Sequence, residues 1–220
     1  MIVDVLIPAR GAGADGIELD VLLDAAGAVL VLHDADLKRL CGRPGRVEDL
    51  REAERKTLRV GGQPVPTLAE VLEAAGALEV NVEIKAPHVA RMGELVARTA
   101  KVIRESGRAE QILVSSFDPF SLVQFHRHVP DIALAFLFHD EQPLPLRRGW
   151  VGTWMGASLF HPQNTLCDEQ TMKAWHTAGM AINVWTVDEA AELERLARLG
   201  VDGVFANDPG HALAVFTAMG

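Results

Sequence analysis

The sequence contains little cysteine, since Cys41 and Cys167 are the only two among its 220 residues. They lie in unrelated segments and lack the close spacing of a metal-binding pair, so we expect both to be free thiols. With so few cysteines, neither a disulfide framework nor a cysteine-ligated zinc site is expected to stabilise the fold.

Long hydrophobic runs and concentrations of positive charge are also missing. No apolar run reaches the roughly 18 to 20 residues that cross a bilayer, and the first residues, MIVD, lack the basic start of a signal peptide. We therefore expect no membrane span and a cytoplasmic location. The formal net charge is −9 and no stretch concentrates Lys and Arg, which argues against a general nucleic-acid-binding protein.

The chain does contain enough apolar sequence for a single core. Hydrophobic residues make up 49% of the 220 residues, and no low-complexity tract or linker divides them. A chain of this size and composition ordinarily folds around one core. We therefore predict a single domain over residues 1–220.

Short apolar runs alternate with longer amphipathic segments, a pattern typical of a parallel sheet wrapped by helices. The candidate parallel strands are 16–21, 80–85, 112–116, 132–137, 157–161, 181–187 and 201–206. Helices are predicted at 47–58, 67–76, 89–106, 119–128, 143–150, 167–178, 188–198 and 209–217. Thr67 is a candidate helix cap, with Glu70 completing a capping box. The turn-rich region at about 22–66 is predicted to be an insertion that contains a hairpin and loops.

A closed barrel of this type uses eight strands, and the missing strand could only be Ile2 to Ile7. The segment Pro8 to Asp15 that follows it reaches at most ~27 Å when extended, which leaves no room for the usual helical crossover. We therefore predict an α/β barrel of the TIM type that is incomplete or irregular at its N-terminal strand and helix. An uncovered strand edge is an association surface, so we expect a homo-oligomer in preference to a monomer with a complete ring.

The stretch from Gly16 to Asp34 brings acidic and imidazole groups together. Glu18 and Asp20 are two residues apart, so on a strand their side chains leave by the same face. A turn at Ala25 to Gly27 then leads into a second apolar run that ends at His33. If the two runs pair as a hairpin, we expect His33 to lie level with Asp20.

Glu83 and Lys85 end the next predicted strand and also share a face. Three carboxylates suit a hard divalent ion, Mg²⁺ or Ca²⁺, better than zinc, and Lys85 beside such an ion could hold a phosphate. Acids at single strand ends are also typical of solvated termini. Their co-occurrence at the carboxyl ends of several strands, where parallel barrels carry their chemistry, favours a site.

Other aromatic and imidazole groups are placed by the rule that site residues lie at the carboxyl ends of the strands. Trp185 is expected to line the pocket, and His161, at the end of a strand before Pro162, could face the site. Trp154 and Trp175 are predicted to pack in the interior. Surface positions are expected for the remaining histidines considered, which are His126, His128, His139, His176 and His211.

A set of motifs from about residue 13 to the C-terminus matches one known family. They are Gly13-Ala14-Asp15, Glu18-Leu19-Asp20-Val21, His33-Asp34 with Leu37, Pro66-Thr67-Leu68, Glu83-Ile84-Lys85, Ser115-Ser116-Phe117-Asp118, Trp185-Thr186-Val187 and Gly203 to Pro209. In combination they make the chain resemble the glycerophosphodiester phosphodiesterases, metal-dependent hydrolases on a TIM barrel.

The resemblance implies hydrolysis of a small-molecule glycerophosphodiester to glycerol 3-phosphate and an alcohol, with Mg²⁺ or Ca²⁺ as cofactor. The roles that it implies are metal ligation by Glu18, Asp20 and Glu83, proton transfer by His33 as one of two catalytic histidines, phosphate contact by Lys85, and a pocket wall formed by Trp185.

The sequence departs from the family upstream of residue 13. The family opens with a strand ending in His-Arg-Gly, then a Pro-Glu-Asn loop and a helix, whereas Ala9-Arg10-Gly11 is the nearest match here, with Ala9 in place of the first histidine. Either residue 1 is not the native start or the protein has lost competence. We therefore expect weakened hydrolysis, with a non-catalytic phosphodiester- or phosphate-binding barrel as the alternative. A barrel enzyme for sugar phosphates is disfavoured because the acidic Asn207-Asp208-Pro209 stands where such barrels carry Gly-rich loops.

Overall fold

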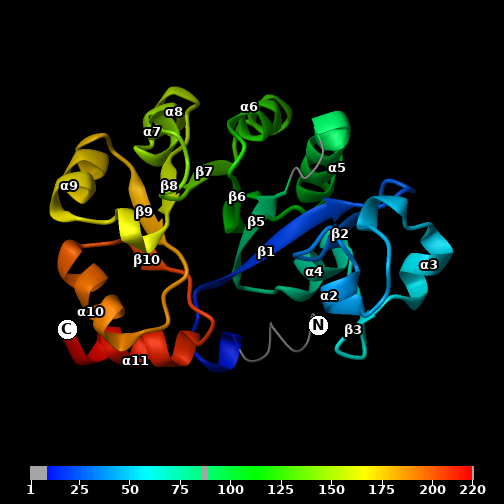
Figure 1. Cartoon of the computed structure of the whole chain (residues 1–220), viewed down its shortest axis with the longest axis horizontal. Helices are drawn as coiled ribbons and strands as arrows, with labels where there is room; N and C mark the ends of the chain where they lie inside the picture. Colours follow the sequence, from blue (N-terminus) through cyan, green and yellow to red (C-terminus); the bar gives the residue numbers. More distant parts are fainter. Residues whose placement is uncertain (1–8, 86–88, 220) are drawn as a thin grey trace.

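A computed structural model describes residues 9–85 and 89–219 of the chain. Its centre is an eight-stranded sheet with the strand order β10-β9-β8-β7-β6-β5-β1-β2, and helices lie around the outside of the curled sheet (Figure 1). The neighbouring pairs from β1 to β10 are parallel, and β2 is antiparallel to β1. The strands of this sheet are β1 (Gly16–Leu23), β2 (Val29–Val31), β5 (Glu79–Ile84), β6 (Ile112–Ser116), β7 (Ala133–Phe138), β8 (Leu159–Pro162), β9 (Ala181–Val184) and β10 (Gly203–Val204). The predicted α/β barrel class is confirmed.

Most of the predicted helices form within a residue or two of their expected bounds. They are α4 (Leu68–Ala74), α5 (Val89–Ser106), α6 (Pro119–His128), α9 (Glu169–Thr177), α10 (Ala190–Leu199) and α11 (Pro209–Met219). The predicted helix at 143–150 is replaced by two short ones, α7 (Leu144–Arg147) and α8 (Trp150–Trp154), separated by Gly149 with φ 73°. Within the two described ranges, none of the helices combines the length and the apolar character needed to cross a membrane.

The described chain begins with a helical turn at residues 9–11. Gly13 ends this turn with φ 80°, and the amides of Gly13 and Ala14 donate to the carbonyls of Arg10 and Ala9, which is the Schellman pattern of a helix end. Residues 9–14 thus turn back on themselves instead of running extended, but the expectation that no crossover helix fits between Ile7 and Gly16 is not tested, because it depends on a strand at Ile2 to Ile7. The run Ile2 to Ile7 lies outside the described residues, so the prediction of an eighth strand there is not tested.

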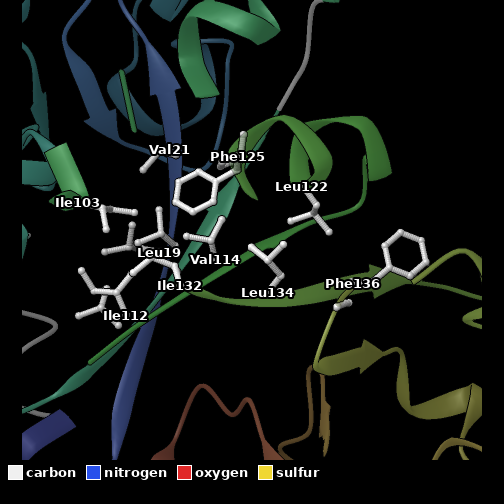
Figure 2. Packing of buried hydrophobic residues seen from close by; sticks show 14 of the residues in the cluster. Leu19, Val21, Ile103, Ile112, Val114, Leu122, Phe125, Ile132, Leu134 and Phe136 are labelled. Atoms are coloured by element: carbon white, nitrogen blue, oxygen red, sulfur yellow. The ribbon is translucent and has the colours of Figure 1, made fainter. Parts of the chain in front are cut away.

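The core lies between the outer face of the sheet and helices α5 and α6, as Figure 2 shows. Side chains alternate between the two faces of a strand, and the register aligns Leu19 of β1 with Val82 of β5 and Val82 with Val114 of β6. These apolar side chains are buried with Ile103 of α5 and Phe125 of α6. The acidic residues that alternate with them on β1 and β5 are thereby turned to the concave face.

The insertion after β1 has an apolar cluster of its own. Besides β2 it contains α2 (Lys38–Cys41), a 3-10 turn η1 (Val47–Asp49), α3 (Glu52–Thr57), β3 (Arg59–Val60) and β4 (Gln63–Pro64). The helix predicted at 47–58 is split at Leu50, which is extended and buried in this cluster. The capping box of Thr67 and Glu70 is present at the start of α4.

Asp24 organises the hairpin that joins β1 to β2. Its Oδ1 accepts hydrogen bonds from the amides of Ala26 at 2.9 Å and Ala28 at 2.8 Å. The resulting register pairs Val21 with Val31, and the amide of Leu32 donates to the carbonyl of Asp20 at 3.1 Å. Leu32, and not His33, therefore lies opposite Asp20, one residue away from the expected register.

The concave face of the sheet carries several polar side chains. The register runs from Glu83 to Ser115, then to Ala135 and Leu159, so His161, two residues after Leu159, faces the same side. Its ring is fully buried and lies edge-on to Phe205, with centroids 4.8 Å apart. Among the described residues, three buried atoms on this face have no hydrogen-bond partner, namely Asn81 Oδ1, Ser115 Oγ and His161 Nδ1.

A substitution in the hairpin tests the role of Asp24. The side chain of Asp24 is fully buried and its Oδ2 lies 3.3 Å from Nε of Arg55. We expect Asp24→Ala to lower the free energy of unfolding by about 2–4 kcal/mol, because it removes two turn hydrogen bonds and leaves the mostly buried guanidinium of Arg55 without this carboxylate. Urea unfolding followed by circular dichroism measures this loss. Glu52→Ala, which breaks the exposed Glu52–Lys56 pair, is the control and should leave the midpoint unchanged; equal midpoints for the two variants would contradict the assignment.

The buried imidazole of His161 predicts acid sensitivity. Burial lowers the pKa of His161 to about 3 from its ordinary 6.5, so below pH 6.5 the unfolded chain takes up a proton that the folded chain does not. Stability should therefore be lost as the pH falls from 6.5 towards 3, by roughly 2 kcal/mol between pH 6.5 and 5. Urea unfolding at these two values should show a smaller loss for His161→Gln than for the parent. Equal losses in the two proteins would show that His161 titrates normally.

Candidate active site

Three carboxylates converge at the concave side of the sheet. One oxygen each from Glu18, Asp20 and Glu83 lies within 4.8 Å of the others. The parallel register sets Asp20 directly beside Glu83, and the two-residue period of β1 places Glu18 on the same face. The structure thus brings together the three residues that the sequence analysis selected as candidate metal ligands.

The close approach of these carboxyl groups disfavours the ionised forms of Glu18 and Glu83. Desolvation is the largest cause that raises the pKa of Glu18 to about 8, and repulsion from Asp20 and Glu83 adds to it. Desolvation, followed by repulsion from Asp20, likewise raises the pKa of Glu83 to about 7. Three oxygen donors that repel one another are a set that a divalent cation of the Mg²⁺ or Ca²⁺ kind would neutralise. The residues present therefore fit a hard cation.

Lys85 supplies a positive charge at the edge of the carboxylate group. Its Nζ lies 3.0 Å from Oδ1 of Asp20, and the Lys85 side chain remains 25% exposed. Lys85 is the first residue after β5 and lies two residues beyond Glu83, so its side chain leaves the strand on the same face. An ammonium group that is partly open to solvent beside a cation-binding carboxylate can also contact an anion.

His33 is held by an acidic and a basic neighbour. Its Nδ1 lies 2.6 Å from Oδ1 of Asp34, and the guanidinium of Arg39 binds both carboxylate oxygens of Asp34. The hydrogen bonds from Arg39 and then His33 hold the pKa of the Asp34 carboxyl well below its usual range. With Nδ1 occupied by Asp34, the Nε2 atom is the one left for proton transfer. The sequence analysis named His33 but assigned no role to Asp34 or Arg39.

An aromatic cluster lies at the carboxyl ends of β6, β7 and β9. The ring of Phe117 meets those of Trp185 and His139 edge-on, with centroid distances of 5.5 Å and 5.8 Å. The Nε1 atom of Trp185 donates to the carbonyl of His161 at 2.7 Å, which fixes the indole. Sequence reasoning expected Trp185 here but missed Phe117 and placed His139 on the surface. Both residues directly follow a strand, Phe117 after β6 and His139 after β7. The rule that site residues lie at the carboxyl ends of the strands would therefore have predicted both.

The remaining imidazoles divide into one buried group and several exposed ones. His161, expected to face the site, lies on the concave face but is fully buried, with Nε2 3.4 Å from Nδ2 of Asn183. Its contact with substrate remains a prediction, and the burial of its ring argues against it. His126, His128, His176 and His211 are exposed, as expected.

The Ala9-Arg10-Gly11 segment lies at the opposite end of the sheet from the carboxylates. The guanidinium of Arg10 donates to the carbonyls of Ala74 and Ala75 at the end of α4, next to the turn that leads into the first residue of β5. Its match to a strand-end His-Arg-Gly tripeptide was therefore wrong, because these residues form a helix end that packs where the strands begin.

Comparisons with known proteins agree with this arrangement. The sequence model of the glycerophosphoryl diester phosphodiesterase family matches residues 6–211. A glycerophosphodiester phosphodiesterase of Caldanaerobacter subterraneus subsp. tengcongensis is 32% identical over 212 residues, which cover 90% of this chain and 84% of the relative. A glycerophosphodiester phosphodiesterase of Bacillus altitudinis is 30% identical over 217 residues, covering 93% and 87% of the two chains.

The fold is shared with solved structures as well. An Oleispira antarctica phosphodiesterase, solved in complex with its product sn-glycerol-3-phosphate, superposes with a TM-score of 0.88 at 23% identity. The match covers 98% of this chain and 90% of that structure. Since the family model spans most of the sequence and these curated relatives match over 84% and 87% of their length, the chain belongs to the glycerophosphoryl diester phosphodiesterase family.

Proposed function

We propose that this chain hydrolyses glycerophosphodiesters to glycerol 3-phosphate and an alcohol, with a divalent cation held by Glu18, Asp20 and Glu83. The observation that carries the proposal is the convergence of three carboxylates within 4.8 Å, with the Lys85 ammonium 3.0 Å from one of them. Family membership supports the reaction class. The product seen in the Oleispira antarctica relative supports glycerol 3-phosphate as the phosphorylated product, with the alcohol as the leaving group.

The cation would supply charge neutralisation on the non-bridging phosphate oxygens. Lys85 contributes a second positive charge from the protein itself, and its partly exposed Nζ can meet an anionic substrate beside Asp20. Mg²⁺ and Ca²⁺ both prefer oxygen ligands, so the donor set leaves the choice between them open. Lys85 is therefore assigned to phosphate binding and orientation.

His33 is assigned to proton transfer. Its Nδ1 is engaged by Asp34, so Nε2 is the atom that would take or give the proton. The amide of the preceding residue, Leu32, donates to the backbone carbonyl of Asp20, which ties the histidine segment to the strand that carries this carboxylate. Trp185 and its neighbour Phe117 would form an apolar wall for the glycerol or alcohol part of the substrate.

The lack of a recognisable His-Arg-Gly tripeptide in the sequence motivates an expectation of slow turnover. Acid–base catalysis of this reaction uses a base for the attacking group and an acid for the leaving alcohol. Ala9 lies at the far end of the sheet from the carboxylates, so its segment does not supply the second group. The second candidate function is a barrel that binds a phosphodiester or a phosphate without hydrolysing it, for which the Lys85 ammonium beside the carboxylates would suffice.

Cation binding by the carboxylates can be tested without any assay of activity. Addition of Mg²⁺ or Ca²⁺ at about 100 times its dissociation constant should raise the melting temperature by roughly 5–10 °C through mass action. Asp20→Asn should abolish most of this increase because it removes the central donor. Differential scanning fluorimetry with each metal, and with EDTA, measures the effect.

A matched control lies on β5, the strand that carries Glu83. Glu79 is an exposed acid at the start of β5, at the end of the strand away from Glu83, and Glu79→Gln should keep the full metal response. If Asp20→Asn responds as strongly as Glu79→Gln, the carboxylate group is not the cation site.

Hydrolysis should depend on His33. We expect His33→Ala to lower the turnover of glycerophosphocholine by about 10²- to 10⁴-fold, measured as release of glycerol 3-phosphate with saturating metal. The control is His176→Ala, since His176 also pairs with an aspartate, Asp202 at 3.1 Å, but on the exposed side of α9. This control should retain the parent rate.

Two results would contradict parts of the proposal. A parent that turns over near the ordinary enzyme rate of about 10 per second would show that another group replaces the second histidine. A parent that binds glycerol 3-phosphate with metal but gives no product at any pH would identify the chain as a binding barrel instead.

A further inference from the structure

The short helix α8 leaves its two largest side chains in solvent, whereas Val151 and the capping Met155 pack against the core. Its glycine side faces the core: a Cβ on Gly149 or Gly152 would lie 2.7 Å or 2.6 Å from ring atoms of Phe160. Its large side chains, Trp150 and Trp154, face solvent. Helices of a globular domain normally turn their apolar residues inward, so this orientation is not explained by packing of the barrel.

The exposure of the two tryptophans is large. Trp154 is 85% exposed and Trp150 is 61% exposed, and Leu144 of the preceding helix α7 is 44% exposed. Trp175 is 4% exposed and donates its Nε1 hydrogen to the carbonyl of Arg148, at 3.1 Å. The prediction that Trp175 packs in the interior is confirmed, whereas that for Trp154 was wrong. The glycines at 149 and 152 leave no room to turn the indoles inward.

The sequence segment that contains these tryptophans carries positive charge and no negative charge. No acidic residue occurs between positions 142 and 167, whereas Arg147 and Arg148 lie directly before Gly149 and Trp150, in a chain of net charge −9. Both arginines are exposed. Arg148 interacts electrostatically with Asp168, whose pKa is lowered chiefly by its bond to the Thr171 amide, and Arg147 donates to the backbone carbonyl of Asp140 at 3.5 Å. The surface of Leu144, Arg147, Arg148, Trp150 and Trp154, here called the α7–α8 patch, is thus basic and aromatic.

The area of the patch favours a lipid surface over another protein. Complete burial of two tryptophans would remove at most roughly 500 Å² of accessible surface, which is short of the about 800 Å² per partner in a stable protein interface. Tryptophan and arginine are, by contrast, the side chains that settle at the boundary between lipid headgroups and acyl chains. We propose that the α7–α8 patch docks the enzyme on the surface of anionic phospholipid bilayers, without spanning them.

The position of the patch relative to the site agrees with this proposal. The α7–α8 segment leaves β7 at His139, whose ring contacts Phe117 in the aromatic cluster of the site. Figure 1 shows α7 and α8 at the rim of the fold, outside β7 and β8. Docking through this segment would hold the carboxyl ends of the strands near the bilayer while the carboxylates remain in water.

Vesicle binding by the full chain tests the proposal. We expect the parent to sediment with vesicles of phosphatidylcholine containing phosphatidylglycerol, with a blue shift of its tryptophan emission, and to bind phosphatidylcholine vesicles at least tenfold more weakly. The double variant Trp150→Ser/Trp154→Ser should lose at least tenfold in affinity for the anionic vesicles. Arg147→Glu/Arg148→Glu should lose at least fivefold at low salt, and added salt should weaken binding of the parent.

Matched controls separate the patch from general effects of surface changes. Leu213→Ser removes a 47% exposed apolar side chain from α11, and Arg104→Glu reverses an exposed charge on α5; both should bind vesicles as the parent does. Turnover of water-soluble glycerophosphocholine should be unchanged in all four variants, which keeps this test independent of the proposed reaction. Melting temperatures confirm that the variants are folded.

Two outcomes would overturn the proposal. If the parent forms a dimer in sedimentation velocity without lipid and the tryptophan double variant is a monomer, the patch belongs to an interface between copies of the chain. If anionic vesicles bind the parent and the tryptophan double variant equally, or bind neither, the patch has no role in lipid docking.

Discussion

The mutual repulsion of three carboxylates is the constraint on which the site depends. The parallel register of β1 and β5 sets Asp20 beside Glu83, and the strand period adds Glu18 on the same face. Desolvation and repulsion raise the pKa of Glu18 and Glu83 into the neutral range, so the folded site carries either protons or compensating positive charge. Lys85 provides one such charge. A single ammonium does not balance three carboxylates, and the strand ends are therefore suited to a divalent cation.

The insertion after β1 serves this site from outside the barrel. Asp24 bonds the amides of the hairpin turn, and the hairpin in turn sets the position of His33 relative to Asp20. The separate apolar cluster around Leu30 and Leu37 gives the insertion its own packing. Asp34 and Arg39 then orient the imidazole. The three carboxylates proposed as metal ligands therefore lie on the sheet, whereas His33, proposed for proton transfer, lies in the insertion. The backbone hydrogen bond from the Leu32 amide to the Asp20 carbonyl joins the two.

Local sequence signals predicted much of the fold because they act over one turn or one strand. The capping box at Thr67 and the apolar period of residues 89–106 correspond directly to α4 and α5. Signals that depend on distant packing were less reliable. The helix predicted at 47–58 is broken where Leu50 enters the insertion cluster, and His33 is one residue away from its expected register because Asp24 sets the length of the turn.

The sequence by itself determined the alternating elements of a parallel sheet and the residues that meet at its carboxyl ends, since a two-residue period assigns each acid to a face. The tertiary structure alone decided how deep those residues lie and what touches them. It buries His161 under Phe205, joins Phe117 to His139 and Trp185, and turns the tryptophans of α8 to solvent. These features arise from contacts between strands and helices far apart in the chain, and no local propensity encodes them.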